Sequence, residues 1–294
     1  RSTPLYSSAA SDVYKRQAMG TELTKKGIKT PLPLWSAIAN EQNYDEVVKI
    51  HKSYIDNGCN IITTNTFRTT ERTYKKAGYK NSFLASNNSS DLAIKAANEA
   101  RKNHETLIAY SIAPLEDCYE PDNFPGQLVA FKEYDYMIKK LNNKSIDIIL
   151  FETMGNIKEI ETLLSASNIS IHKKWLSIVL KSENELLDGS SINKAITLAK
   201  THSIDTFLIN CTTIDIVQDA IKHLKNNWHK DWGVYPNVGK SMPEKDGFIK
   251  HKHKNIKISN FLKMIVKDGA KVIGACCGST PDTISNIVKT LESN

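Results

Sequence analysis

The sequence predicts a parallel α/β fold, a (β/α)8 barrel, on three observations. Short β-rich runs alternate with helical stretches, and the runs are almost continuously apolar, as in strands buried on both faces of a parallel sheet. The chain has 294 residues, close to the roughly 250 of such a barrel. The glycine-rich fingerprints of dinucleotide-binding and phosphate-binding sheets are absent, which favours a closed barrel over an open doubly wound sheet.

The first 17 residues, RSTPLYSSAASDVYKRQ, show neither strand alternation nor a helical stripe. They resemble translated adapter sequence, so we expect residues 1–17 to be a leader foreign to the natural protein, with a native disordered tail as the alternative. The eighth strand of the barrel is expected just before Met19, where this leader stands. The barrel domain is therefore predicted over 18–294, with its first strand truncated or replaced by the leader. A makeshift strand over 12–16 would be such a replacement.

Seven strands are expected after the leader, each followed by a helix. Asn43 with Glu46, and Asn156 with Glu159, form capping patterns that predict helix starts. Thr280 before a proline predicts the start of the last helix. The predicted strands are 60–67, 106–112, 146–153, 175–181, 206–211, 233–237 and 271–275.

Composition predicts a soluble globular protein. Hydrophobic residues make up 40% and charged residues 24% of the chain, and no apolar run approaches the roughly 18 residues of a membrane span. The five cysteines are an odd number in a chain with no apolar signal-peptide core. We therefore expect free thiols in a reducing, cytoplasmic environment, and neither a disulfide framework nor a membrane partner.

The formal charge of +7 is concentrated in one segment. Residues 240–257 carry six Lys and two His against Glu244 and Asp246. We interpret the segment as a solvated loop, with a surface that attracts anions as the alternative. Only Gly247 and Phe248 stand among the lysines, without the repeated aromatic and glycine pattern of an RNA-binding or single-strand-binding module, so no nucleic-acid partner is expected.

Three cysteines are predicted to meet at one mouth of the barrel. Cys211 ends the run TFLINC, while Cys276 and Cys277 end the run KVIGACC; active sites of such barrels lie at the C-terminal ends of the strands. Gly278 permits a turn that lets both neighbouring cysteines face one partner. Unrelated core cysteines and a disulfide between Cys276 and Cys277 are the alternatives to the metal site that we favour.

Three thiolates suit Zn²⁺, and no fourth protein ligand is evident. Cys59 falls near the start of its strand, at the opposite end of the barrel, and Cys118 lies in a loop without ligand spacing. His251 and His253 lie in the lysine-rich segment, where histidines are usually solvated. An open, catalytic zinc is therefore expected, and such a site can bind and deprotonate a thiol substrate.

Seven short motifs resemble, in chain order, those of the zinc-dependent homocysteine S-methyltransferases, and the resemblance extends from Met19 to about Leu291. It implies a (β/α)8 barrel in which Cys211, Cys276 and Cys277 hold zinc and the homocysteine sulfur takes the fourth position. Methyl transfer then yields methionine, a step of methionine biosynthesis. The motifs are MGTEL at Met19, LWSA at Leu34, TTNTF at Thr63, FET at Phe151, INC at Ile209, YPN at Tyr235 and GACCGSTP at Gly274.

The resemblance also implies the residues that bind the amino acid. Glu152 matches the carboxylate that binds the substrate ammonium group; its alternative role is to pair with a nearby lysine or a backbone amide. The backbone around Ala18 and Met19 matches the turn that holds the substrate carboxylate. Asn65 and Trp35 match positions that line the mouth, although Trp35 could equally pack on the barrel rim.

Three residues depart from the family pattern. The family carries an acidic residue and two glycines just before MGTEL, and this chain has Arg16, Gln17 and Ala18 there. An arginine cannot replace a carboxylate that helps to hold an ammonium group. We therefore expect the natural protein to be active, and this sequence to be impaired in folding or in substrate binding.

The methyl donor is predicted to be an onium compound. The LWSA motif and the single-domain length resemble the branch that uses S-methylmethionine; betaine is the alternative donor, and cobalamin-linked enzymes need further domains. A cationic donor prefers an aromatic or acidic pocket, for which Tyr119 and Glu120 are candidates. Two other functions stay open: a non-catalytic zinc or thiol sensor, and nucleic-acid binding by residues 240–257.

Overall fold

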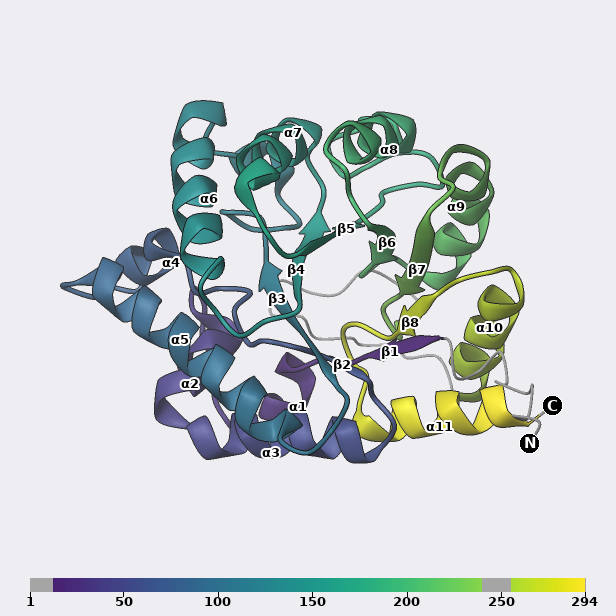
Figure 1. Ribbon diagram of the computed structural model, residues 1–294, viewed down its shortest axis with the longest axis horizontal. Helices are drawn as coiled ribbons and strands as arrows, with labels where there is room; N and C mark the ends of the chain where they lie inside the picture. The colour runs from purple at the N-terminus through teal and green to yellow at the C-terminus, as the bar shows by residue number, and fades with distance from the viewer. Residues whose placement is uncertain (1–12, 240–254, 294) are drawn as a thin grey trace, which may run out of the picture.

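The computed structural model describes residues 13–239 and 255–293, without the side chains of 255 and 256, and its eight parallel strands close a barrel (Figure 1). Each strand pairs with the next, and the last pairs with the first. The predicted fold class is confirmed. The strands are β1 (Tyr14–Arg16), β2 (Ile61–Thr63), β3 (Leu107–Ile112), β4 (Ile148–Met154), β5 (Lys173–Ile178), β6 (Thr206–Asn210), β7 (Asp231–Tyr235) and β8 (Val272–Gly274).

The first strand is formed by residues that the sequence predicts to be part of a leader. β1 lies between β8 and β2, and Arg16 is in register with Gly274 on one side and Ile61 on the other. Backbone bonds extend this pairing: Tyr14 N donates to Lys271 O at 2.8 Å. These residues fill the place where the sequence predicts the first strand of the barrel. Main-chain groups form the hydrogen bonds between strands, so a segment whose side chains lack strand periodicity can still complete the barrel.

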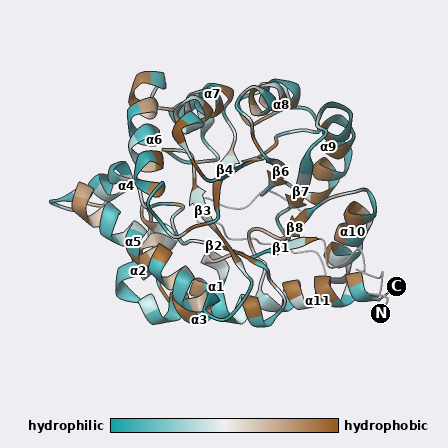
Figure 2. Ribbon diagram, viewed as in Figure 1, coloured by the Kyte–Doolittle hydropathy of each residue, from teal (hydrophilic) through white to brown (hydrophobic). Residues whose placement is uncertain are grey.

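Helices surround the barrel on all sides (Figure 1). In Figure 2, hydrophobic residues follow most of the strands and alternate with hydrophilic residues along the helices, as expected of helices between a sheet and solvent. No helix among the described residues is both long and apolar enough to span a membrane. The helices and short 3-10 turns are α1 (Gly20–Lys25), η1 (Trp35–Ile38), α2 (Ala39–Gln42), α3 (Tyr44–Asp56), α4 (Glu71–Lys76), α5 (Ser82–Arg101), η2 (Pro121–Asn123), α6 (Gln127–Leu141), α7 (Ile157–Ala166), η3 (Ser167–Ile169), α8 (Ile192–Thr201), α9 (Ile214–Asn227), α10 (Asn255–Lys267) and α11 (Pro281–Glu292).

Two of the three predicted helix starts have the expected side-chain caps. Asn156 accepts hydrogen bonds from the first turn of α7, and Thr280 forms a capping box with Thr283 at α11. Asn43 precedes α3 but makes no side-chain cap bond, so that part of the prediction is wrong. Its backbone, at φ −141° and ψ 40°, lies outside the extended region that aims a capping oxygen at the helix. Glu46 instead pairs with Lys26 and Lys49.

The core is divided into two layers by the sheet. A large apolar cluster fills the space between strands and helices. A smaller cluster fills the barrel interior, with Ile61, Trp175 and Leu208 among its members. Cys211 and Cys276 belong to this inner cluster, so the packed interior ends in sulfur atoms where β6 and β8 end.

Candidate metal and substrate site

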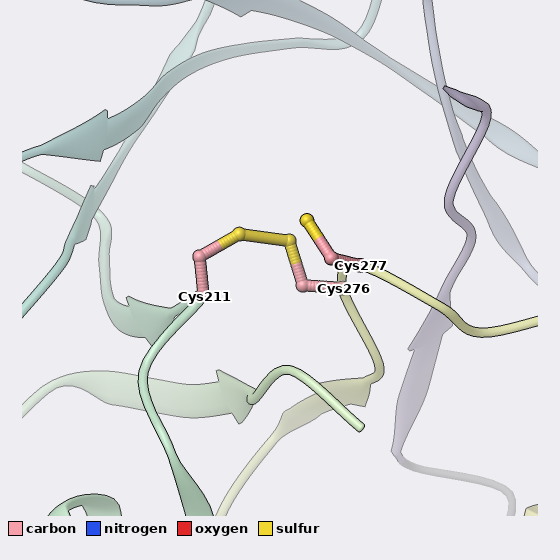
Figure 3. A group of neighbouring side chains, drawn as sticks. All are labelled: Cys211, Cys276 and Cys277. Atoms are coloured by element: carbon pink, nitrogen blue, oxygen red, sulfur yellow. A yellow bond between two sulfur atoms is a disulfide. The ribbon is translucent and has the colours of Figure 1, made fainter. Parts of the chain in front are cut away.

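The three predicted cysteines converge at the C-terminal mouth of the barrel. Cys211 directly follows β6, while Cys276 and Cys277 follow β8 in the next turn of chain. Their Sγ atoms all lie within 4.8 Å of one another, and Figure 3 shows the three side chains turned toward a common point. Cys211 and Cys276 are buried and Cys277 is half-buried. Three sulfur atoms at this spacing can bind one metal ion if all three are thiolates.

The structure joins Cys211 and Cys276 by a disulfide bond and leaves Cys277 free. The expectation of free thiols only is therefore wrong for this pair. The disulfide considered in advance, between Cys276 and Cys277, is not formed. Strands on either side of β7 bring the Cα atoms of Cys211 and Cys276 to 5.5 Å, within the ordinary range for a disulfide. Reduction of this bond restores three thiols that can serve as metal ligands.

The backbone around the cysteines is fixed by the loop after β7. Cys276 N donates to Pro236 O at 2.8 Å, and the Asn237 side chain donates to Cys211 O at 3.3 Å. Gly278 has φ 81°, so it makes the predicted turn in a region that favours glycine. These bonds hold the two cysteine segments at a set distance before any ligand binds.

Burial raises the pKa of the Cys277 thiol to about 11, against the smaller opposing effects of Tyr119 and Arg16. In the metal-free protein this thiol is therefore protonated at neutral pH. A divalent cation at the three sulfur atoms would supply the positive charge that a thiolate needs in this buried place. The residues present thus suit a zinc ion chemically as well as in spacing.

A cavity of about 380 Å³ opens beside the sulfur atoms, within the range of small-molecule sites. Every residue that the sequence predicted for the substrate lines it. Arg16 and Gln17, which depart from the family pattern, line it as well, and so does Phe67, for which the sequence predicted no role. The predicted residues are Ala18, Met19, Trp35, Asn65 and Glu152, together with the three cysteines.

Glu152, near the end of β4, is buried, lines this cavity and pairs with Arg16. Arg16 Nη2 donates to Glu152 Oε1 in an ion pair. Ser111 Oγ donates to Glu152 Oε2 at 2.5 Å. The alternative considered for Glu152, a nearby lysine or a backbone amide, is wrong in detail, because the structure gives it an arginine and a serine hydroxyl as partners.

Asn65 and Trp35 shape one wall of the cavity. The Asn65 side chain donates to Ser36 O at 2.7 Å and to Asn40 Oδ1 at 2.9 Å, which holds the Trp35 turn against the barrel. Trp35 meets Phe67 edge to face, with ring centres 6.0 Å apart, and its ring leaves no room for a Cβ at Gly20. Trp35 therefore both lines the mouth and packs on the rim.

The remaining candidates divide between the cavity wall and other places. Tyr119 and Cys118 line the cavity, and burial raises the pKa of the Cys118 thiol to about 12. Glu120 lines a separate small recess and accepts a hydrogen bond from Asn123, so the structure does not bring it to the site. Cys59 precedes β2, at the opposite end of the barrel as expected. His251, His253 and most of the lysine-rich segment lie outside the described residues.

Comparison with known proteins agrees with this geometry. A family model described as "Homocysteine S-methyltransferase" matches residues 18–291. Similar curated proteins include "Homocysteine S-methyltransferase 2" of Zea mays, 29% identical over 94% of this chain and 88% of its own length. "Selenocysteine methyltransferase" of Astragalus bisulcatus is 28% identical over 94% and 91%, and "Homocysteine S-methyltransferase" of Escherichia coli is 25% identical over 91% of each chain.

The fold also matches solved structures. The metallated form of the homocysteine methyltransferase MmuM from Escherichia coli superposes with a TM-score of 0.81 at 21% identity, over 95% of this chain and 96% of that one. Its oxidized form superposes with a TM-score of 0.82 at 21% identity, over 94% and 95%. The likeness in structure shows the shared barrel fold, and the family match covers nearly the whole chain. The chain belongs to the homocysteine S-methyltransferase family.

Proposed function

We propose that this methyltransferase holds zinc through Cys211, Cys276 and Cys277 and transfers a methyl group from S-methylmethionine to homocysteine, giving methionine. The observation that carries the zinc proposal is the meeting of three Sγ atoms within 4.8 Å at the edge of the cavity. When bound, zinc supplies a Lewis acid that keeps the substrate sulfur deprotonated, since a free thiol has a pKa of about 8.5. No side chain then needs to act as a general base.

The cavity positions the two ends of homocysteine at different walls in this proposal. The sulfur lies beside the cysteines, and the carboxylate faces the main chain at Ala18 and Met19, where α1 begins. Gly278 N donates to Thr21 Oγ1 at 2.9 Å, which ties α1 to the cysteine turn. This bond supports a fixed separation between the two ends, and orientation of the reacting atoms is a large part of the rate in a displacement reaction.

The wall formed by Trp35, Phe67 and Tyr119 supports a cationic methyl donor. All three rings line the cavity, and an onium cation is attracted to aromatic faces. Aromatic rings accept a sulfonium or a quaternary ammonium group, so betaine is the alternative donor. The LWSA motif, to which Trp35 belongs, favours S-methylmethionine. A reducing, cytoplasmic environment suits this function, because the disulfide-bonded pair must be reduced before it can bind zinc.

The test uses the reduced, zinc-loaded protein with homocysteine and separate methyl donors. We expect methionine from S-methylmethionine, about one zinc per chain, and loss of both in Cys211→Ala. Cys59→Ala is the matched control, because Cys59 is also buried but precedes β2 at the other end of the barrel. Full activity of Cys211→Ala without zinc would overturn the metal proposal, and turnover with betaine alone would overturn the donor. Zinc binding without turnover of any donor would favour a sensor.

A further inference from the structure

Glu152, the carboxylate assigned to the substrate ammonium group, already has a cation of its own. Its Oε1 atom is paired with Arg16 and its Oε2 atom accepts from Ser111. The side chains of Arg16 and Glu152 are only 8% and 5% exposed. The pair is therefore shielded from water, where a charge-assisted contact is much stronger than on a surface.

Arg16 is held at this place from several directions. Its backbone is paired with both β2 and β8. Its Nε donates to Thr63 Oγ1 at 3.0 Å, and its guanidinium carbon lies 4.5 Å from the centre of the Tyr235 ring. An arginine restrained by a strand, a hydroxyl and an aromatic ring has little freedom to leave the carboxylate.

An incoming ammonium group must either displace this guanidinium or bind beside it. Displacement leaves a buried guanidinium without its carboxylate, which is costly in a shielded place. Binding beside it sets two cations next to one carboxylate, and like charges repel strongly where water is scarce. In both cases the contact with Glu152 adds little to the affinity for homocysteine.

We propose that Arg16 is a specificity-determining residue: it is the resident cation on Glu152, so the site selects its acceptor by the sulfur and not by the ammonium group. The acceptors are then short-chain thiols with a carboxylate, whether or not they carry an α-amino group. This inference rests on the proposed function, which supplies the methyl transfer to a thiol, and on the ammonium-binding role that the family resemblance implies for Glu152.

The first test compares homocysteine with 4-sulfanylbutanoate, which is homocysteine without its amino group. For the protein as it stands, we expect kcat/KM values within about threefold of each other, since a productive charged contact is worth on the order of tenfold or more. Glu152→Gln should not raise the preference for homocysteine, because it leaves the Arg16 charge without its carboxylate and so disfavours a second cation there. A preference for homocysteine above tenfold that Glu152→Gln abolishes would overturn the proposal.

The second test frees the carboxylate. Arg16→Gln removes the charge and retains a polar side chain, and it should raise the preference for homocysteine at least tenfold, through a lower KM with kcat little changed. Arg101→Gln is the matched control, because Arg101 also pairs with a carboxylate, Asp147, just before β4 at the far end of the barrel. An unchanged ratio in folded Arg16→Gln would overturn the proposal.

A binding measurement separates this inference from the proposed function. Calorimetry with L-methionine and with 4-(methylsulfanyl)butanoate needs neither a methyl donor nor zinc. We expect similar affinities in the unaltered protein and a gain of about tenfold for L-methionine alone in Arg16→Gln. If no donor gives turnover and this gain is still seen, the proposed function fails and the role of Arg16 stands. If a methyl donor gives turnover but Arg16→Gln shows no gain in affinity for L-methionine, the proposed function stands and the role of Arg16 is wrong.

Discussion

Buried His51 on α3 makes the protein sensitive to acid. Its ring is fully buried, and Nδ1 lies 3.1 Å from Oε1 of Gln17, a residue that lines the cavity. Nε2 has no hydrogen-bond partner among the described residues. Burial lowers the pKa of His51 from 6.5 to about 3. The ring therefore stays neutral in the folded protein through the whole physiological range.

This shift gives a signed prediction for stability. As pH falls below about 6.5 the unfolded chain takes up a proton at His51, while the folded chain does not until about pH 3. Between pH 7.5 and 5.5 the folded state should lose about 1.4 kcal/mol through this residue. Urea unfolding at both pH values measures the loss, and His51→Gln should reduce it by that amount. Equal losses in both proteins would contradict the assignment.

The residues of the site were predictable where they directly follow an apolar strand. Cys211 ends such a run, so its place at the mouth could be predicted from the barrel alone, whereas Glu152, which lies inside β4, was predicted through the family resemblance. The Arg16 contact could not be derived in this way. It joins residues 136 positions apart, and the arginine lies in a segment without strand periodicity. The disulfide was equally hidden, because it depends on the distance between two strand ends.

At the scale of elements, strands were predicted well where apolar residues continue along the whole strand. The seven apolar strands all exist, but the predicted strand 60–67 is reduced to Ile61–Thr63. Beyond it, Thr66 Oγ1 donates to Ser111 O at 2.8 Å, and Asn65 bonds to the Trp35 turn. Side-chain hydrogen bonds replace the main-chain bonds between strands there, and the pattern of apolar residues in the sequence does not reveal this replacement.

The short strand β1 should be essential for a closed barrel. Deletion of residues 1–17 would leave β2 and β8 with unpaired edges and remove the buried Val13 and Arg16. We expect a loss of roughly 3 kcal/mol or more in unfolding free energy, or aggregation. Deletion of residues 1–12, which retains β1, is the matched control and should melt close to the parent. Thermal melts followed by circular dichroism measure both; equal melting of the two deletions would contradict a structural role for β1.

At the scale of the whole molecule, the cysteines connect strands that are not neighbours. β7 lies between β6 and β8 in the barrel order, so a link from Cys211 to Cys276 spans three strands at the mouth. In the oxidised protein the disulfide is that link. In the reduced protein a zinc ion held by the same sulfur atoms would replace it, and two distinct chemical states would close the same end of the barrel.

This exchange predicts that zinc stabilises only the reduced protein. Zinc that binds the folded state at a hundred times its Kd adds about 2.7 kcal/mol, which raises the Tm of a chain of this size by about 4 °C. In the oxidised protein two of the three ligand sulfur atoms are consumed by the disulfide, so zinc should leave the Tm unchanged. Calorimetric melts with zinc or EDTA, each with and without a non-chelating reductant, measure the Tm of the reduced and the oxidised protein. Zinc should not change the Tm of Cys211→Ala with or without the reductant. An equal rise in the oxidised protein would place the zinc elsewhere, because ligand thiolates must be free to bind it.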